Sequence, residues 1–245
     1  MISRLEQAFE AERRFTSDAS HELRTPMSVI MAQTELTLEQ EREKEEYKAA
    51  LEVIHRQGSR MNRLIENMLD YTRLEQRTGE YPLDTSNLSE QVSAICEDMK
   101  LIRNKEITLT YQVEPGVTIR GNALLLGRML QNLIDNAYKY GKEQGHIRVI
   151  LQSNWKDELE EWIRPEQSAK KYVLLTVEDD GIGISQSAQE KIFERFYRED
   201  VSRSNHSVQG YGLGLSMVKK IAELHQATIC VQCEEGVGSI FIVIF

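Results

Sequence analysis

Residues 132–139 read NLIDNAYK and form the centre of a predicted helix over 122–140. Apolar residues recur every three or four positions here and mark the face that packs against a core: Leu126, Met129, Leu130, Leu133, Ile134 and Ala137. Asn132, Asn136 and Lys139 follow one another at i, i+4 and i+7 and form a separate polar stripe. Such a stripe is usually a solvated helix face, but an amide oxygen also suits Mg²⁺ and a lysine suits phosphate.

Two glycine-containing stretches favour a ligand-binding role for this polar stripe over a solvated helix face. The first is Asp179-Asp180-Gly181-Ile182-Gly183, directly after a predicted strand, where Asp179 is placed to accept a hydrogen bond from an exocyclic amine. The second is Gly210-Tyr211-Gly212-Leu213-Gly214-Leu215, which opens a predicted helix and therefore forms a phosphate cradle. Its alternating glycines do not fit the dinucleotide fingerprint G-x-G-x-x-G. The polar segment 200–209 before it is expected to be a mobile lid.

A histidine near the N-terminus supplies a possible nucleophile. Residues 15–26 read FTSDASHELRTP, and the apolar residues Phe15, Ala19, Leu23 and Val29 are expected to face inward. This places His21 and Thr25 together on the outer face, with Glu22 next to them. Pro26 lacks an N–H and should bend the helix at this point. A lone helical histidine is more often a surface residue, so the surroundings carry the argument.

Composition and periodicity indicate two domains. The 245 residues carry 30 basic and 39 acidic side chains, a net charge of −9, which argues against general binding to nucleic acid or to an anionic membrane. Three cysteines exclude a disulfide scaffold. Residues 1–76 read as a helical hairpin whose two apolar stripes favour dimerisation into a four-helix bundle. Residues 77–87 form a hinge, and 88–245 a second domain.

The second domain mixes helices and strands. We expect a mixed, largely antiparallel sheet with helices on one face, hence an α+β fold. The predicted helices cover 87–104, 122–140, 186–195 and 212–225. The predicted strands cover 106–113, 117–120, 146–152, 172–178, 227–233 and 239–245. Residues 155–171 form a long loop that can include a short helix at 158–163.

These motifs, in this order, resemble the cytoplasmic core of sensor histidine kinases. The string His21-Glu22-Leu23-Arg24-Thr25-Pro26 resembles the H box, and Asn132–Lys139 the N box. Asp179–Gly183, Ile192–Arg198 and Gly210–Leu215 resemble the first glycine box, the F box and the second glycine box. The resemblance covers nearly the whole chain. It implies a Bergerat ATP-binding fold, an α/β sandwich, after the helical hairpin.

The resemblance also assigns roles to individual residues. It makes Asn136 the main Mg²⁺ ligand, Asp179 the acceptor for the adenine amine, and Lys139 a phosphate contact, with Tyr140 beside the base. The residues that shape the pocket and lid are Gly181, Gly183, Gly210, Gly212, Leu213 and Gly214. ATP-hydrolysing relatives of this fold carry Glu where this chain has Asn132. Because an amide is no general base, the pocket should bind ATP yet hydrolyse it poorly.

The implied reaction is phosphoryl transfer from ATP to His21 and then to an aspartate of a response-regulator receiver domain. Glu22 would orient the imidazole, and Arg198 and Arg203 could reach the transferring phosphoryl group. Thr25 either positions a water for the reverse, phosphatase reaction or bonds a carbonyl one turn back. Family habit further implies a homodimer and a cytoplasmic portion of a membrane-anchored sensor, with the anchor outside this chain.

Two alternatives remain open at this stage. A degenerate kinase would dimerise as a scaffold without transferring phosphate, and an ATP-hydrolysing conformational machine would need the base that Asn132 lacks. The chain also departs from the family pattern His-Gly-Gly, reading His225-Gln226-Ala227.

Overall fold

The structure, a computed structural model, describes residues 2–76, 81–102, 106–155, 171–199 and 210–245. The chain divides into two compact units, Met1–Arg73 and Leu74–Phe245. Each unit is described by itself below.

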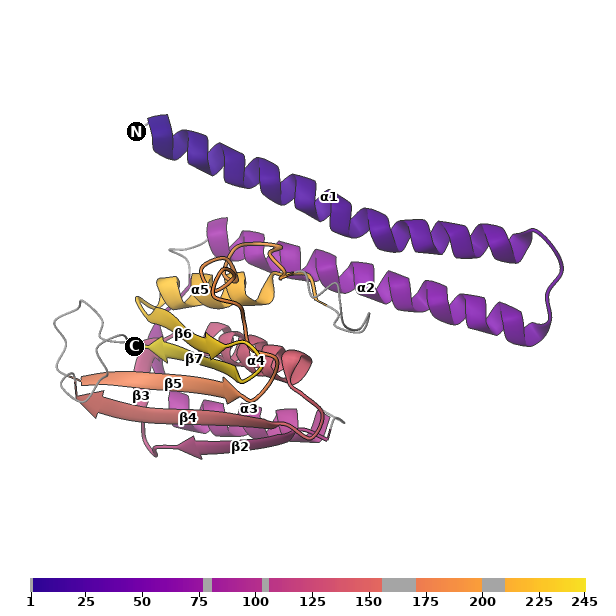
Figure 1. The fold of residues 1–245 in the computed structure, drawn as a ribbon. Coiled ribbons are helices and arrows are strands. Elements are labelled where there is room, and N and C mark those ends of the chain that lie inside the picture. Colours follow the sequence, from indigo (N-terminus) through magenta and orange to yellow (C-terminus); the bar gives the residue numbers. More distant parts are fainter. Residues whose placement is uncertain (1, 77–80, 103–105, 156–170, 200–209) are drawn as a thin grey trace. The chain divides into compact units, whose positions relative to one another are not determined.

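The first unit is a hairpin of two long helices, α1 (Ile2–Leu38) and α2 (Lys44–Gln76) (Figure 1). Ala19 is buried, and the Phe15 and Tyr71 rings lie 6.3 Å apart, so the two helices share an apolar seam. The turn between them is fixed by side chains. The Arg42 guanidinium donates to the Leu36 carbonyl at 2.9 Å, and the Glu46 carboxylate accepts from the Glu43 N–H, satisfying a free amide at the start of α2.

Many large apolar side chains of the hairpin stay exposed. Val29, expected to face inward, is 40% exposed, so that prediction was wrong for the isolated chain. The reason is that one hairpin has two apolar stripes and only one seam in which to bury them. The exposed set comprises Met27, Val29, Met31, Leu36, Leu38, Tyr47, Leu51, Ile65 and Leu69.

The second unit is built on a five-stranded sheet with the strand order β2-β4-β5-β7-β6. Its strands are β2 (Thr108–Val113), β4 (His146–Trp155), β5 (Lys171–Asp179), β6 (Thr228–Glu234) and β7 (Gly238–Ile244). The pair β2–β4 is parallel and the other three pairs are antiparallel, which confirms the predicted mixed, largely antiparallel sheet. A separate ribbon joins β1 (Asp84–Asn87) to β3 (Thr118–Gly121).

Helices α3 (Leu88–Ile102), α4 (Ala123–Tyr140) and α5 (Gly214–Leu224) cover one face of this sheet, as predicted (Figure 1). Their apolar faces meet alternate strand residues in a continuous core. Fully buried side chains of this core include Leu126, Leu130, Leu133, Ile134, Leu175, Val177, Val218, Ile221, Phe241 and Val243. Burial of each such side chain contributes roughly 1.5–3 kcal/mol, so α4 is held rigidly against the sheet.

The N-terminus of α4 is tied to the C-terminus of α5. The Asn122 side chain caps α4 by accepting from the Leu125 N–H at 3.1 Å, and the Asn122 backbone N–H donates to His225 Nε2 at 3.0 Å. The end of α5 is a Schellman motif, because the Ala227 N–H bonds the Ala222 carbonyl at 2.9 Å. Its left-handed residue is Gln226, with φ 55°, where the family pattern has glycine.

Two predictions of secondary structure were wrong. Residues 186–195, predicted as a helix, form consecutive turns, with i→i−3 bonds such as Lys191 to Ala188 mixed among i→i−4 bonds. Only Ala188 and Ile192 of that segment are buried, too narrow a stripe to hold so short a helix. The strand β1 was missed because it is four residues of polar, turn-forming type. The predicted helix at 158–163 lies outside the described residues.

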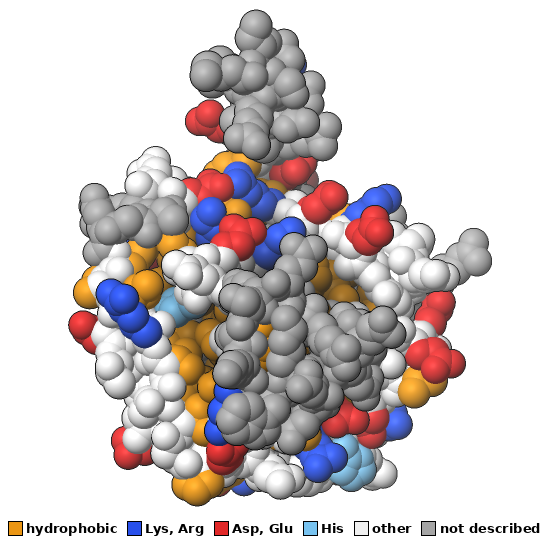
Figure 2. All heavy atoms as spheres, turned by 90° about the vertical axis from the view of Figure 1, so that its left-hand side faces the viewer, with side chains coloured by type: hydrophobic (Ala, Val, Ile, Leu, Met, Phe, Trp, Pro, Cys, Tyr) orange, Lys and Arg blue, Asp and Glu red, His pale blue; other side chains and the backbone are white. Residues whose placement is uncertain are grey.

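Charged side chains of both signs are interspersed on the face drawn in Figure 2. Among the described residues, no helix is both long enough and apolar enough to cross a membrane.

Candidate functional site

The carboxylate of Asp179 stands at the end of β5 and is 7% exposed. The Gly181 N–H donates to its Oδ1 at 2.9 Å. Burial raises the pKa of Asp179 to about 6, against the lowering effect of that hydrogen bond. A buried carboxylate with spare acceptor capacity is costly without a donor and favourable with one, so it suits the exocyclic amine of a bound base.

The loop after Asp179 is held in place by its neighbours. The Ile182 N–H donates to the Tyr140 carbonyl at the end of α4, at 3.2 Å, and the Ile182 carbonyl accepts from Gly236 at 2.7 Å. Gly183 has φ +69° and packs against the backbone of Glu234, so a side chain there would be strained and would clash. The loop therefore lies between α4 and the turn that joins β6 to β7.

The polar stripe of α4 faces the start of α5. Asn132 donates to the Arg128 carbonyl at 2.9 Å, its Nδ2 lies 3.8 Å from the Met217 sulfur, and a Cβ on Gly214 would stand 3.3 Å from its Oδ1. The residue before α5, Leu213, provides no side-chain cap. Within the described part of the chain the first amides of α5 have no side-chain cap, so they suit an anion next to Asn132 and, one turn on, the half-buried Asn136.

A group of cations completes this side of the site. Burial lowers the pKa of Lys139 to about 8, and the positive charge of Arg198 lowers it further, while Asp135 acts in the opposite direction. The Lys139 ammonium lies 4.7 Å from the centroid of the Tyr140 ring, and Gly210 lies directly against it. Lys139 is half-buried and Arg198 is exposed, and two positive charges this close repel each other unless an anion lies between them, so these two cations suit a phosphate.

The segment 192–198 is bonded to the second glycine stretch. The Phe196 N–H donates to the Gly212 carbonyl at 3.0 Å. Gly212 has φ +67°, and a Cβ there would stand 2.7 Å from the Phe196 Cα, so glycine is required. This contact helps to hold Arg198 near Lys139, close enough for its charge to lower the Lys139 pKa.

The residues of the histidine motif lie on α1, in the other unit. His21 and Thr25 are exposed, while Glu22 is half-buried, as the helical spacing predicts. The Thr25 hydroxyl donates to the His21 carbonyl at 3.4 Å, which is the structural explanation that the sequence left open. Pro26 lies inside α1, which bends along its length (Figure 1).

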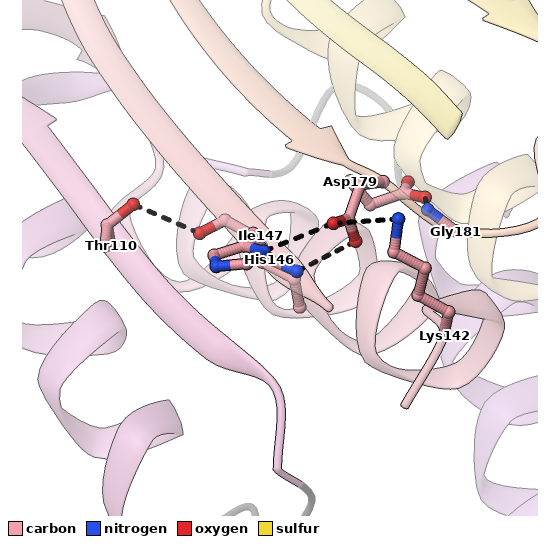
Figure 3. Close-up of polar contacts among 7 residues, drawn as sticks. Thr110, Lys142, His146, Ile147, Asp179 and Gly181 are labelled. Carbon is pink, nitrogen blue, oxygen red and sulfur yellow. Dashed lines mark hydrogen bonds and ion pairs between the residues drawn. The ribbon is translucent and has the colours of Figure 1, made fainter. Parts of the chain in front are cut away.

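The structure thus brings the predicted nucleotide residues together in one region of the second unit. Gly181 lies against Asp179 and the Tyr140 carbonyl, and Gly214 lies beside Asn132. Gly210 and Arg198 lie beside Lys139. Arg203 lies outside the described residues. Sequence reasoning missed Lys142 and His146, which contact Asp180 in the loop between Asp179 and Gly181, from the turn after α4 and from the start of β4 (Figure 3). No motif marks them.

Comparison with known proteins agrees with this geometry. Residues 121–245 match the family described as histidine kinase-, DNA gyrase B- and HSP90-like ATPase, an ATP-binding domain. Residues 11–77 match the His Kinase A (phospho-acceptor) domain.

Curated relatives match both domains. The chain is 34% identical over 238 residues to the sensor histidine kinase RppB of Synechocystis, covering 96% of this chain and 49% of the relative. It is 34% identical over 219 residues to the sensor histidine kinase HprS of Escherichia coli, covering 89% and 44%. The chain thus spans about half the length of these relatives.

Solved structures share the fold. The histidine kinase AdeS of Acinetobacter baumannii has a TM-score of 0.62 at 17% identity, covering 92% of this chain and 96% of that one. The histidine kinase ThkA, solved in complex with response regulator protein TrrA, has a TM-score of 0.69 at 20% identity, covering 99% and 65%. These likenesses confirm the predicted fold, a helical hairpin followed by an α/β domain. With both domains matched in this order, the chain belongs to the sensor histidine kinase family.

Proposed function

We propose that this chain is a protein histidine kinase that phosphorylates His21 with ATP and passes the phosphoryl group to an aspartate of a response regulator. The observation that carries the proposal is the site of the second unit. The second unit combines the buried carboxylate of Asp179 with the cations Lys139 and Arg198 and with the start of α5, where Leu213 gives no side-chain cap. An exposed histidine in the matched phospho-acceptor domain supplies the nucleophile.

The proposed site roles follow from the chemistry of each group. Asp179 accepts from the adenine amine, and Tyr140 lies beside the base. The backbone of Gly181, Gly183, Gly210, Gly212, Leu213 and Gly214 shapes the pocket around the nucleotide. Lys139 and the first amides of α5 hold the phosphates, and Arg198 stabilises the charge on the transferring group. Arg203 is proposed for the same task from the sequence alone.

The residues present also fit a magnesium ion. Among the described residues no group of three or more His, Cys, Asp or Glu could hold a metal by itself. A half-buried amide oxygen, Asn136, beside the groups proposed to hold the phosphates suits an ion that keeps its waters and phosphate oxygens as its other ligands. When bound, Mg²⁺ would neutralise phosphate charge.

In the transfer step, a neutral ring nitrogen of His21 attacks the γ-phosphorus in line. A nitrogen–phosphorus bond forms, the bond to the bridging β–γ oxygen breaks, and ADP leaves. Glu22 accepts a hydrogen bond from the N–H of the other ring nitrogen and so fixes the tautomer of His21. Asn132 offers no base for water, because an amide cannot take its proton. The phosphoryl group therefore goes to His21 rather than to water.

The exposed apolar residues of the hairpin support a homodimer, since a second hairpin would bury them as a four-helix bundle. We place a phosphoacceptor domain at 1–76, a hinge at 77–87 and an ATP-binding domain at 88–245. The solved complex of ThkA with TrrA supports a receiver domain as the acceptor. A phosphatase role for Thr25 has less support, because its hydroxyl is engaged with the His21 carbonyl.

The test is incubation with γ-labelled ATP and Mg²⁺, followed by acid and alkali treatment. We expect label that is labile in acid, stable in alkali and absent from His21→Ala. His55→Ala is a matched control, because it removes another exposed histidine of the hairpin and should leave the label unchanged. Absence of label in a chain that binds ATP would support the scaffold alternative instead.

A further inference from the structure

Asp180, the residue after the buried carboxylate of Asp179, is held by three donors. Its Oδ1 accepts from the His146 N–H at 2.8 Å, and its Oδ2 lies 3.2 Å from His146 Nδ1 and 3.3 Å from Lys142 Nζ. Its own N–H donates to the His146 carbonyl at 3.3 Å. Figure 3 shows His146 and Lys142 converging on this loop from β4 and from the turn after α4.

These bonds extend the sheet by one residue pair. The antiparallel register of β4 and β5 ends at the pair Ile147 and Asp179, so the next pair would be His146 and Asp180. At that pair the Asp180 carboxylate accepts the His146 N–H that a backbone carbonyl would otherwise accept. The backbone is thereby free to leave the sheet at once, directly after Asp179.

The close approach is built into the turn before β4. A Cβ on Gly145 would stand 2.6 Å from Asp180 Oδ1 and 2.9 Å from the Lys142 carbonyl. Any side chain at 145 would therefore displace the carboxylate of Asp180 from the His146 N–H. The Asp180 carboxylate therefore reaches the His146 N–H only because position 145 has no side chain.

We propose that Asp180 is a positioning residue for base recognition: by closing the last pair of β4 and β5 with its side chain, it fixes Asp179 where the adenine amine must meet it. Successive strand residues point to opposite faces, so Asp180 itself faces away from the base and acts through Asp179. This inference rests on the proposed ATP site. The preference for adenine over a base that lacks the amine then depends on Asp180, although Asp180 does not touch the base.

The test compares ATP with inosine triphosphate, which carries an oxygen in place of the amine. Dissociation constants are measured by calorimetry for the full chain and its variants. The wild type should prefer ATP by roughly tenfold or more, since hydrogen bonds to a charged group are worth about 1.5–3 kcal/mol. Asp180→Ala should weaken ATP binding by about three- to tenfold, as expected for one lost hydrogen bond, and leave inosine triphosphate binding within about twofold.

Three further variants separate positioning from general damage. Asp180→Asn keeps an acceptor for the His146 N–H and should restore most of the preference for ATP. Gly145→Ala should reproduce Asp180→Ala by displacing the carboxylate. Lys142→Ala removes only an ion pair whose lysine side chain is 59% exposed, and should change the preference by less than about twofold.

The outcomes are distinguishable. If Asp180→Ala weakens both nucleotides equally, or keeps the wild-type preference, Asp180 does not position Asp179 and the inference is wrong. If the wild type binds neither nucleotide, the proposed ATP site itself fails, whatever the variants do.

Discussion

Replacing Asp179 by asparagine should make the nucleotide-free chain more stable while it weakens nucleotide binding. The substitution preserves size and keeps an oxygen that can accept from the Gly181 N–H, the bond seen at 2.9 Å. It removes the charge and turns one carboxylate oxygen into an N–H₂ group, which can still bond the Ser239 hydroxyl. Because that charge is buried without a salt-bridge partner among the groups that shift its pKa, its removal relieves an energetic cost.

The size of the effect follows from the pKa. Burial raises the pKa of Asp179 from its ordinary 3.8 to about 6, and this difference corresponds to about 3 kcal/mol of folding free energy when the group is fully charged. The pKa of Asp179 is higher in the native state than in the unfolded state, so protonation stabilises the native state. This stabilisation is fully present below pH 3.8, where Asp179 is protonated in both states. It is lost as the pH rises through about 6.

Urea unfolding at pH 5 and pH 7.5, without nucleotide, measures this cost. Both tryptophans, Trp155 and Trp162, belong to the unit Leu74–Phe245, so their fluorescence reports on that unit. Asp179→Asn should exceed the wild type by up to about 3 kcal/mol at pH 7.5 and by about 1 kcal/mol less at pH 5. Its affinity for ADP should fall by roughly tenfold or more.

Two results would refute this reasoning. One is a variant that is less stable than the wild type at pH 7.5. The other is a stability difference that is the same at both pH values, because the effect would then not come from the charge of Asp179.

Three further predictions concern the same unit. At pH 8.5 nucleotide binding should take up more than about half a proton, because phosphate restores the lowered pKa of Lys139, and calorimetry in two buffers should show this uptake lost in Lys139→Met. Gln226→Gly should raise the free energy of unfolding by about 0.5–1 kcal/mol by relieving a left-handed φ of 55°, whereas Gln226→Ala should bring no gain. Gly212→Ala should abolish most nucleotide binding by displacing Phe196, while Gly236→Ala, with φ +80° and open space around it, should cost stability but keep affinity; equal affinity losses would contradict the packing argument.

Much of the fold was readable from the sequence because its signals are local. The 3.6-residue period located α4 and its polar stripe, and the glycines located the loops on either side of it. A strand was also predicted at the place of each of the five strands of the main sheet. Where the local signal was weak, prediction failed: residues 186–195 have too few buried positions to form a helix, and β1 carries turn-forming residues.

The positioning role of Asp180 had no local signal. Lys142, His146 and Asp180 meet only because β4 and β5 pair in a particular antiparallel register, and a register is set by tertiary packing rather than by neighbouring residues. The exposure of Val29 was missed for a related reason. An apolar helical stripe predicts burial but not whether its own chain or another one provides it.

The central claim is that this chain directs the γ-phosphoryl group of ATP to His21 and not to water. A single-turnover experiment with γ-labelled ATP and excess protein tests it by following protein-bound label and free phosphate together. The account predicts that label appears on the protein first, and that His21→Ala forms neither label nor appreciable free phosphate, because Asn132 supplies no base. Rapid release of free phosphate by His21→Ala would contradict it and show an ATP-hydrolysing enzyme instead.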